Sequence, residues 1–236
     1  MKFEFIPVGL VHSPFKEKFG TPRQPGLIKQ ASARIEILPP FDCDEAFEGL
    51  QDFSHLWLVF VFHKNADSEW RPKVRPPRLG GNQRMGVFAT RSPYRPNPVG
   101  LSAVELDGIR RERGKLWLDI RGADLVDGTP LLDIKPYIPY TDCIHEAKAG
   151  YAAAAPQPKL QVVFTDTALK QIRQVQTEYP DLQQMISQVL ELDPRPAYVD
   201  QAKTTSRHAM KLLEFDIHWQ VEGDIATVLS LQTLSN

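Results

Sequence analysis

The sequence lacks the features of several large classes of protein. Its 236 residues contain only two cysteines, Cys43 and Cys143, which is too few for a disulfide framework. No apolar run approaches the ~20 residues of a membrane-spanning helix. The first residues, MKFEFIPVGLVHSPFKEK, lack the long apolar core of a signal peptide. We therefore expect a globular protein of the reducing cytoplasm, without a membrane segment.

Two common catalytic fingerprints are also missing. No G-x-G-x-x-G follows an expected strand, and Gly80-Gly81 is not a phosphate loop, so a Rossmann cofactor site is not expected. There is no G-x-S-x-G turn of the kind that carries a nucleophilic serine. His55 and His63 bound the apolar run HLWLVFVFH, but no third ligand can be placed beside them, so no metal site is expected.

Acidic residues are absent from one long segment. Between Glu69 and Glu105 there is no aspartate or glutamate, whereas seven bases lie there: Arg71, Lys73, Arg75, Arg78, Arg84, Arg91 and Arg95. The whole chain carries a net charge of −1, so this segment is +7 and the remainder is −8. Such an asymmetry favours a polyanion-binding face on a protein that is not globally basic. Trp70 and Tyr94 in the same segment could stack on nucleic-acid bases.

The basic segment ends in the stretch RMGVFATRSPYRPNPVG, from Arg84 to Gly100. Its prolines fix their own φ and restrict the residues before them, so the loop is stiff and loses little entropy on binding. It presents four side chains suited to a ligand, Arg91, Tyr94, Arg95 and Asn97. An ordinary surface connector is the alternative, because proline-rich loops have no chemistry of their own.

The N-terminal part shows short strands at close spacing and almost no helix. The expected strands are 3–11, 34–38, 55–63, 85–89, 101–109, 115–121 and 131–135. We expect the run at 55–63 to be buried on both faces, and residues 43–53 to form a short helix. This spacing predicts a closed or nearly closed β-barrel over residues 1–150.

The C-terminal part has a different pattern. Residues 151–158, YAAAAPQP, resemble a linker. Beyond them, Thr165 or Asp166 can cap a helix, a second helical stripe runs from Leu182 to Leu190, and residues 213–231 alternate as a hairpin. We therefore expect a mainly β protein, in which an N-terminal barrel is followed by a small α+β domain over residues 159–236.

Polar turns fall at the ends of the expected strands. They are Arg23-Gln24-Pro25, His63-Lys64, Arg91 to Gly100, and Asp127-Gly128-Thr129-Pro130. Loops at one rim of a barrel converge, so these distant turns could form one pocket. The alternative for Asp127-Gly128 is ordinary turn chemistry, since this pair is common in tight turns.

Several long motifs together resemble the TrmO family, also called TsaA-like or YaeB-like. They are PRQPG (22–26), FSHLWLVFVFH (53–63), RPPRLGG (75–81), RMGVFATRSPYRPNPVGLS (84–102), LVDGTPLLDIKPYIPY (125–140) and DPRPAY (193–198). The resemblance covers nearly the whole chain, and the last motif is typical of the bacterial two-domain form.

The resemblance implies an S-adenosylmethionine-dependent tRNA methyltransferase with a β-barrel domain that works as a homodimer. It implies methylation of N6 of threonylcarbamoyladenosine at position 37, in the anticodon loop of threonine tRNA. The cofactor residues that it implies are Arg23, Gln24, Pro25, His63, Lys64, Arg91, Leu101, Asp127, Gly128, Thr129 and Pro130.

The sequence leaves the catalytic base open. A base that accepts the proton of the poorly nucleophilic nitrogen would help the transfer, and Asp127, Asp133 and Tyr137 are the candidates. The alternative is that one of these carboxylates faces the sulfonium of the cofactor instead. For tRNA binding we expect Arg71, Arg75, Arg78, Tyr94, Arg95, Asn97, Arg195 and Tyr198. We hypothesise that the proline-stiffened loop 193–198 folds over the barrel rim.

Two other functions stay open. The first is a tRNA- or RNA-binding module without catalysis, which the basic segment alone would support. The second is a small-molecule-binding barrel whose arginines grip a phosphate.

Overall fold

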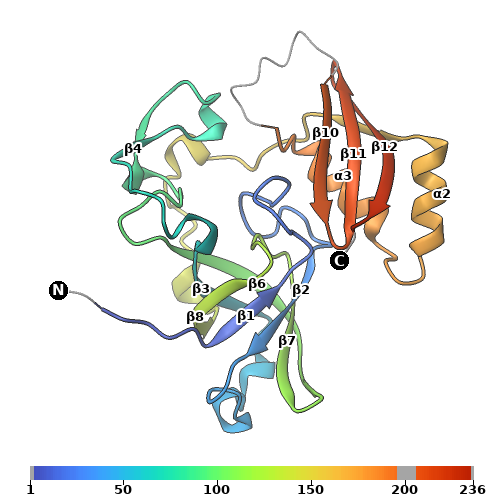
Figure 1. Ribbon diagram of the computed structural model, residues 1–236. Coiled ribbons are helices and arrows are strands. Elements are labelled where there is room, and N and C mark those ends of the chain that lie inside the picture. The colour runs from blue at the N-terminus through green and yellow to red at the C-terminus, as the bar shows by residue number, and fades with distance from the viewer. Residues whose placement is uncertain (1–2, 196–205, 235–236) are drawn as a thin grey trace.

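The computed structural model describes residues 3–195 and 206–234. Its N-terminal part is a closed barrel in the order β1-β2-β7-β6-β3-β8 (Figure 1). The barrel strands are β1 (Gly9–His12), β2 (Ser32–Ile37), β3 (His55–Val61), β6 (Val99–Glu112), β7 (Lys115–Arg121) and β8 (Thr129–Pro136). The predicted fold class, a barrel followed by a small α+β part, is confirmed.

Alternation along the strands builds the barrel core. In β7, Leu116, Leu118 and Ile120 are buried, whereas the charged residues between them face outward. In β3, Leu56, Leu58 and Phe60 are buried, and the residues between them are only half-buried. The prediction that this run is buried on both faces is therefore wrong, because the outer side of the barrel wall is only partly covered.

Three predicted elements differ in the structure. Residues 3–8 lie outside β1, because the partner strands β2 and β8 reach no further than Gly9 along it. Residues 43–53 form two 3-10 turns, η1 (Asp44–Phe47) and η2 (Leu50–Asp52), because Gly49 interrupts them at φ 82°. Of residues 85–89, only Met85 and Gly86 are in a strand, and Val87 begins a 3-10 turn.

Residues 62–98, here called the excursion, leave the barrel between β3 and β6. They contain η3 (His63–Asn65), β4 (Lys73–Val74), η4 (Pro77–Leu79), β5 (Met85–Gly86) and η5 (Val87–Ala89). The excursion closes where the Phe62 N–H donates to the Pro98 carbonyl at 2.8 Å. In Figure 1 it stands above the barrel, on the opposite side from the C-terminal sheet.

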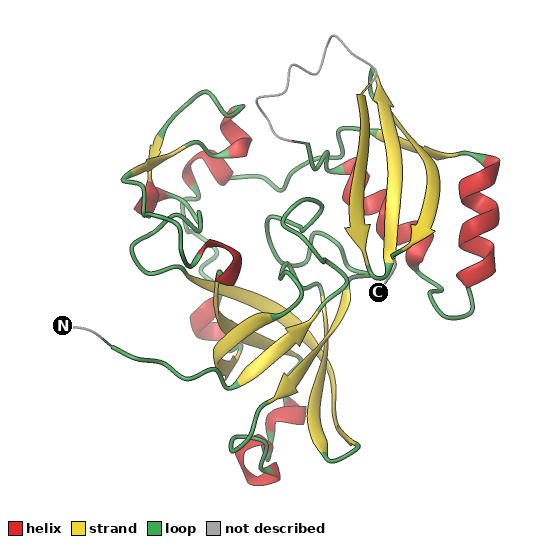
Figure 2. Cartoon of the chain, in the orientation of Figure 1, coloured by secondary structure: helices red, strands yellow, loops and turns green. Residues whose placement is uncertain are grey.

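The C-terminal part is a sheet in the order β10-β11-β12-β9, with two helices packed against it (Figure 2). Its elements are β9 (Gln161–Phe164), α2 (Asp166–Val175), α3 (Leu182–Glu191), β10 (Ser206–Leu212), β11 (Phe215–Glu222) and β12 (Ile225–Thr233). The hydroxyl of Thr165 caps α2, because it accepts from the Ala168 N–H at 3.2 Å. Strands β9 and β10 add to the predicted hairpin.

Between the two parts, α1 (Pro139–Asp142) precedes the expected linker, whereas η6 (Gly150–Ala152) includes the first two residues of that segment. Within residues 3–195 and 206–234, no helix is long and apolar enough to cross a membrane.

The loop of residues 13–31, here called the β1–β2 loop, joins the two parts. Phe15, Ile28 and Ala31 are at most 2% exposed and belong to the core of the C-terminal sheet rather than to the barrel core. The small C-terminal part therefore completes its hydrophobic core with residues from the N-terminal end of the chain.

Candidate functional site

The polar turns open onto one end of the barrel. Strand β3 ends and β6 begins there, because Val61 pairs with Val99. Beside them β1 ends and β8 begins, because Val11 pairs with Thr129. This end, here called the upper rim, therefore gathers the β1–β2 loop, the excursion and the turn before β8, and in Figure 1 it faces the side of the barrel where the C-terminal sheet also lies.

Arg91 links the excursion to the β1–β2 loop. Its Nη1 donates to Oε1 of Gln24 at 2.5 Å. The amide nitrogen of Gln24 donates in turn to the carbonyl of Arg23. Two turns that lie far apart in the sequence are thus bonded to each other at the upper rim.

Arg23 lies between the rim and the C-terminal part. Desolvation lowers the pKa of its guanidinium, and the charge of Asp193 partly offsets this effect. An arginine stays protonated near neutral pH even so, and Arg23 therefore adds a positive charge to the rim.

His63 and Thr129 meet across the barrel mouth. The hydroxyl of Thr129 donates to the carbonyl of Val126 at 2.6 Å and lies 3.4 Å from Nδ1 of His63, which leaves its oxygen free to accept from that nitrogen. Desolvation is the largest cause that lowers the pKa of His63, followed by the charges of Lys64 and Lys18. His63 is therefore mainly neutral at pH ~7.

Asp127 fixes the turn before β8. Its Oδ1 accepts from the Ser13 N–H at 2.8 Å, and its Oδ2 pairs with Lys16 Nζ at 2.9 Å. Gly128 adopts φ 74°, a left-handed conformation that explains the Asp-Gly pair, and its N–H donates to the Val11 carbonyl at 2.8 Å. Both carboxylate oxygens of Asp127 thus already have partners.

Asp124 is a rim residue that sequence reasoning missed. Its Oδ1 accepts a hydrogen bond of 2.6 Å from the hydroxyl of Ser102, which is itself buried. Burial raises the pKa of Asp124 to about 6, although the Ser102 hydrogen bond and the charge of Arg91 oppose the rise. The alternation of β6 could have placed Ser102 inside the barrel, but no sequence signal points to Asp124.

The other two candidate bases lie away from this constellation. Asp133 pairs with Lys135 at 2.8 Å, and its Oδ1 accepts from the Ile134 N–H. Tyr137 follows β8 at the opposite end of the barrel, where its ring lies 5.5 Å from that of Trp57. The structure therefore brings only Asp127, of the three candidates, to the upper rim.

The Arg84 to Gly100 stretch is held by its own contacts. Arg95 Nη1 donates to the carbonyls of Thr90 and Ser92 at 3.1 and 3.3 Å. At its end, a Cβ on Gly100 would overlap the ring of Phe60, so only glycine fits where the chain enters β6. Leu101, the next residue, faces outward from the barrel and is 53% exposed.

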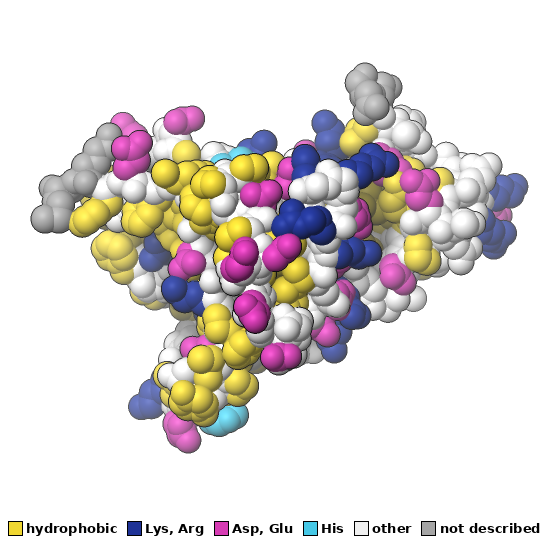
Figure 3. All heavy atoms as spheres, turned by 90° about the horizontal axis from the view of Figure 1, so that it is seen from below, with side chains coloured by type: hydrophobic (Ala, Val, Ile, Leu, Met, Phe, Trp, Pro, Cys, Tyr) yellow, Lys and Arg dark blue, Asp and Glu magenta, His cyan; other side chains and the backbone are white. Residues whose placement is uncertain are grey.

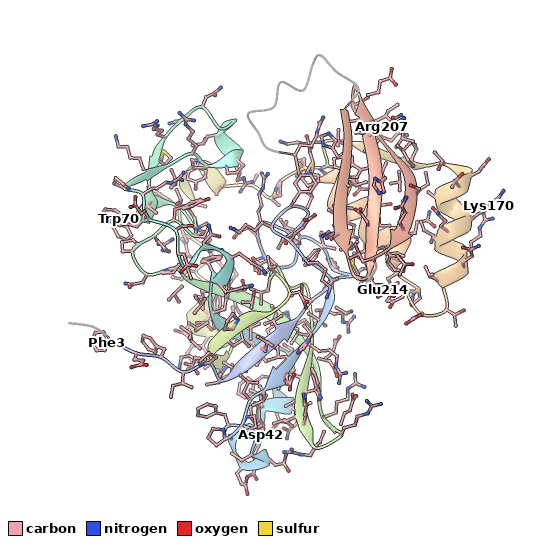
Figure 4. All side chains as sticks on the ribbon, in the orientation of Figure 1. Phe3, Asp42, Trp70, Lys170, Arg207 and Glu214 are labelled. Carbon is pink, nitrogen blue, oxygen red and sulfur yellow. The ribbon has the colours of Figure 1, made fainter. Side chains whose placement is uncertain are left out.

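The residues expected to bind tRNA are mostly exposed on the excursion. The Arg71 guanidinium lies 4.4 Å above the ring of Tyr94, and Arg78 donates to the carbonyl of Ala154. Arg75 and Asn97 are exposed, and so is the side chain of Trp70, labelled in Figure 4. The excursion thus presents cations and aromatic rings on one projecting arm.

Arg195 does not lie on that surface. It is 5% exposed, and its Nε and Nη2 donate to the two carboxylate oxygens of Asp193 at 2.7 and 2.9 Å. The two hydrogen bonds to Asp193 hold the guanidinium inside the protein. Arg195 therefore does not face solvent, although prolines flank it as they do the arginines of the excursion. Tyr198, the other expected residue of this loop, lies outside the described residues.

Comparison with known proteins follows the same division of the chain. Residues 10–143 match the family model described as the tRNA-methyltransferase O N-terminal domain, and residues 157–234 match the TrmO C-terminal domain. The chain is 47% identical over 230 residues to a tRNA (adenine(37)-N6)-methyltransferase of Escherichia coli, which covers 98% of each chain.

Two relatives that match over a shorter length, and one solved structure, also resemble this chain. A human tRNA (adenine(37)-N6)-methyltransferase is 46% identical over 134 residues, 56% of this chain and 29% of the human protein. A Pyrococcus abyssi protein described as a probable S-adenosyl-L-methionine-binding protein is 39% identical over 147 residues, 62% of this chain and 74% of that protein. The crystal structure of TrmO from Pseudomonas aeruginosa superposes with a TM-score of 0.80 at 38% identity, covering 98% of this chain and 99% of that one.

Proposed function

The chain belongs to the tRNA-methyltransferase O family, and we propose that it is an S-adenosylmethionine-dependent enzyme that methylates N6 of adenosine 37 in tRNA. The observation that carries this proposal is the upper rim. There, the turns at Arg23, His63, Arg91 and Asp127 meet below a basic arm. The turns proposed to hold the cofactor and a surface for a polyanion thus lie side by side.

The methylated nucleoside and its tRNA can be named more closely. We propose threonylcarbamoyladenosine at position 37 of threonine tRNA as the methyl acceptor, as the resemblance of the motifs implies. The exposed arginines of the excursion would contact phosphates of the anticodon stem-loop, since arginine and lysine supply most of the affinity for a nucleic-acid backbone.

The charges of the rim fit S-adenosylmethionine. This cofactor carries a carboxylate and a sulfonium, and it supplies an electrophilic methyl group when bound. Arg23 and Arg91 offer guanidiniums that can bind a carboxylate, whereas Asp124 offers a partly buried carboxylate that can face a positive centre. The residues implied by the motifs, Arg23 to Pro25, His63, Lys64, Arg91, Leu101 and Asp127 to Pro130, would hold it.

Asp124 is also the carboxylate that we propose as the proton acceptor. The N6 nitrogen of a carbamoylated adenosine is amide-like, so loss of its proton must accompany attack on the methyl group. A carboxylate with a pKa of about 6 is ionised at neutral pH and is more basic than an ordinary one. Asp127 instead holds the turn through Lys16 and the Ser13 N–H.

We also propose that the protein works as a cytoplasmic homodimer. Phe3, Phe5 and Ile6 are between 68% and 70% exposed, and Leu101 is 53% exposed. Figure 3 shows hydrophobic side chains gathered over the part of one face that adjoins the N-terminal end. Such a patch favours a partner surface, and sedimentation of the purified protein would measure the oligomeric state.

Methyl transfer from labelled S-adenosylmethionine tests the proposal. The purified protein is expected to transfer label to threonine tRNA that carries threonylcarbamoyladenosine at position 37, and not to a tRNA with guanosine at that position. Transfer of equal label to both would show that the acceptor is not adenosine 37.

Equilibrium dialysis distinguishes the two other functions. An RNA-binding module without catalysis should retain tRNA but not labelled S-adenosylmethionine. A phosphate-binding barrel should bind its ligand to the same extent with and without tRNA. We expect retention of S-adenosylmethionine and a methylated product that appears only with tRNA.

A further inference from the structure

The β1–β2 loop is built into the C-terminal sheet by its backbone. The Leu213 N–H donates to the Pro14 carbonyl at 2.7 Å, and Phe15 forms an isolated antiparallel bridge with Leu212. The Lys211 N–H also donates to the carboxylate of Glu17 at 3.1 Å. The loop therefore runs along the end of β10, close to the β10–β11 turn where Figure 4 labels Glu214.

Side chains of the loop fill the core of that sheet. Phe15, Ile28 and Ala31 are buried there, and the Phe19 ring stacks on the fully buried Trp219 with centroids 6.4 Å apart and planes at 16°. Gly20 adopts φ 85°, and a Cβ placed on it would lie 3.4 Å from Sδ of Met210. The loop thus buries apolar side chains in the core of the C-terminal part.

The same loop contacts both the Asp127 turn and the excursion at the upper rim. The carbonyl of Phe15 accepts from the Asp127 N–H at 2.7 Å, and Lys16 pairs with the Asp127 carboxylate. Further along, Lys18 Nζ donates to the carbonyl of Lys64 at 2.8 Å, and Gln24 accepts from Arg91. Within four residues of its burial in the C-terminal core, the loop therefore contacts the Asp127 turn and the His63-Lys64 turn.

Long loops without regular structure are mobile unless packing fixes them. In this loop Phe15, Phe19, Ile28 and Ala31 pack in the core of the C-terminal part. We propose that the C-terminal sheet is a positioning element for the cofactor site, and that Phe19 is a positioning residue that acts through the β1–β2 loop. This inference rests on the proposed function for its cofactor, and the pre-ordered loop saves the entropy that binding would otherwise cost.

The test compares two truncations in the C-terminal core of the full-length chain. Phe19→Ala removes the ring that contacts Trp219, whereas Ile172→Ala removes a buried side chain of α2, which packs on β12 and β9 at the far edge of the sheet. Phe19→Ala is expected to raise the Kd and KM for S-adenosylmethionine about tenfold, with kcat at saturating cofactor within about twofold. Ile172→Ala is expected to lower Tm at least as much and to leave that Kd within about twofold.

Hydrogen exchange gives a second measurement that does not depend on the cofactor. Phe19→Ala should speed exchange of the Asp127 and Gly128 amides about tenfold at a temperature well below Tm, whereas Ile172→Ala should not. Phe19→Leu, which keeps apolar area, should restore most of the protection and affinity. If Phe19→Ala does not fold, the smaller truncation Phe19→Val is compared with Ile172→Ala by the same two measurements, and changes in the same direction are expected.

Equal effects of the Phe19 and Ile172 variants on cofactor affinity would overturn the inference, as would unchanged exchange at Asp127. Failure of the proposed function is recognised separately, because the unaltered chain would then not bind S-adenosylmethionine at all. In that case the exchange rates alone still decide whether the sheet positions the rim.

Discussion

At the scale of single residues, Arg91 connects two segments of the upper rim. Its guanidinium joins the excursion to Gln24 of the β1–β2 loop and lies within electrostatic range of Asp124. A planar fork can satisfy two partners at fixed angles, which the ammonium of lysine cannot do.

We therefore expect Arg91→Lys to lower kcat/KM at least about tenfold, which corresponds to ~1.4 kcal/mol of transition-state stabilisation. Steady-state kinetics with tRNA and S-adenosylmethionine measure this, and Tm should stay within about 2 °C because Arg91 is exposed. Arg84→Lys, an exposed arginine of the same arm, is the control and should keep full activity. Near-normal turnover of Arg91→Lys would remove Arg91 from the site.

The carboxyl group of Asp124 gives the reaction a predicted pH dependence. Its pKa of about 6 in the folded protein means that the carboxylate becomes protonated as the pH falls through about 6. A protonated Asp124 cannot accept the N6 proton, so kcat/KM should fall about tenfold per pH unit below that value. In Asp124→Asn the residual kcat/KM should not show this fall below pH ~6. The same pH profile in the variant and in the unaltered chain would contradict the role of Asp124 as proton acceptor.

The carboxyl group of Asp124 also makes the free energy of unfolding depend on pH, and this quantity falls as the pH rises, whereas kcat/KM increases. Between pH ~4 and ~6 the folded state binds the proton that the unfolded state has lost, so the free energy of unfolding falls as pH rises through this window. The cost of the buried charge is then complete above pH ~6. Asp124→Asn keeps an acceptor for Ser102 and should lose this pH dependence, which is of order 1–3 kcal/mol.

Urea denaturation at about pH 4.5 and about pH 7.5 measures the difference. Asp67→Asn, an exposed carboxylate of the excursion, is the control and should behave like the unaltered chain. An equal change of stability with pH in the Asp124 variant would show that another group titrates.

At the scale of elements, the excursion is the part that we expect to grip tRNA. Reversal of charge at Arg71, Arg75 and Arg78 should raise KM for tRNA and flatten the salt dependence by about one unit of slope per lost phosphate contact. Binding of S-adenosylmethionine should stay unchanged. Reversal at Lys170 and Arg173, exposed on α2 at the far side of the C-terminal sheet, is the matched control and should leave KM unaltered.

An unchanged salt slope in the excursion variant would mean that tRNA docks elsewhere. A loss of S-adenosylmethionine binding in that variant would instead show that these three arginines support the cofactor site as well.

The sequence pattern predicted the elements that depend on neighbouring residues in the chain. Leu116, Leu118 and Ile120 alternate with charges, and Thr165 caps a helix, so β7 and α2 could be read from the sequence. Strand β9 could not, because its four residues are stabilised by parallel pairing with β12, more than sixty residues away. The expected helix at 43–53 failed at one residue, Gly49, whose left-handed backbone separates two short turns.

In the site, too, the features set by neighbouring residues could be predicted, and those set by distant contacts could not. The residue types and prolines of the Arg84 to Gly100 stretch predicted a rigid ligand loop, and the barrel topology brought the four turns to one rim. Asp124 and Lys18 could not be found, because their positions depend on contacts with Ser102 and with the carbonyl of Lys64. Arg195 appeared to be a surface residue because its pairing with Asp193 depends on tertiary burial.

At the scale of the whole molecule, the two parts share one segment of chain. Ile28 lies before β2 in sequence, yet it is 2% exposed in the C-terminal core. We expect Ile28→Ala to cost about 2–5 kcal/mol and to speed amide exchange in β10 to β12. Leu118→Ala, a cavity of similar size in the barrel core, is the control.

If the two parts unfold as separate units, the control should leave exchange in β11 unchanged while Ile28→Ala accelerates it. Acceleration of β11 exchange by both variants would mean that the whole chain unfolds in a single cooperative step. No effect of Ile28→Ala on β11 would contradict the shared core.

We propose that this barrel modifies one base of threonine tRNA. Mass spectrometry of the oligonucleotide containing position 37, from threonine tRNA incubated with the protein and S-adenosylmethionine, tests it most directly. We predict a mass gain of ~14 Da at threonylcarbamoyladenosine 37, in proportion to enzyme and strongly reduced with Arg91→Lys. Methylation at another nucleotide, or none while S-adenosylmethionine and tRNA both bind, would contradict the account.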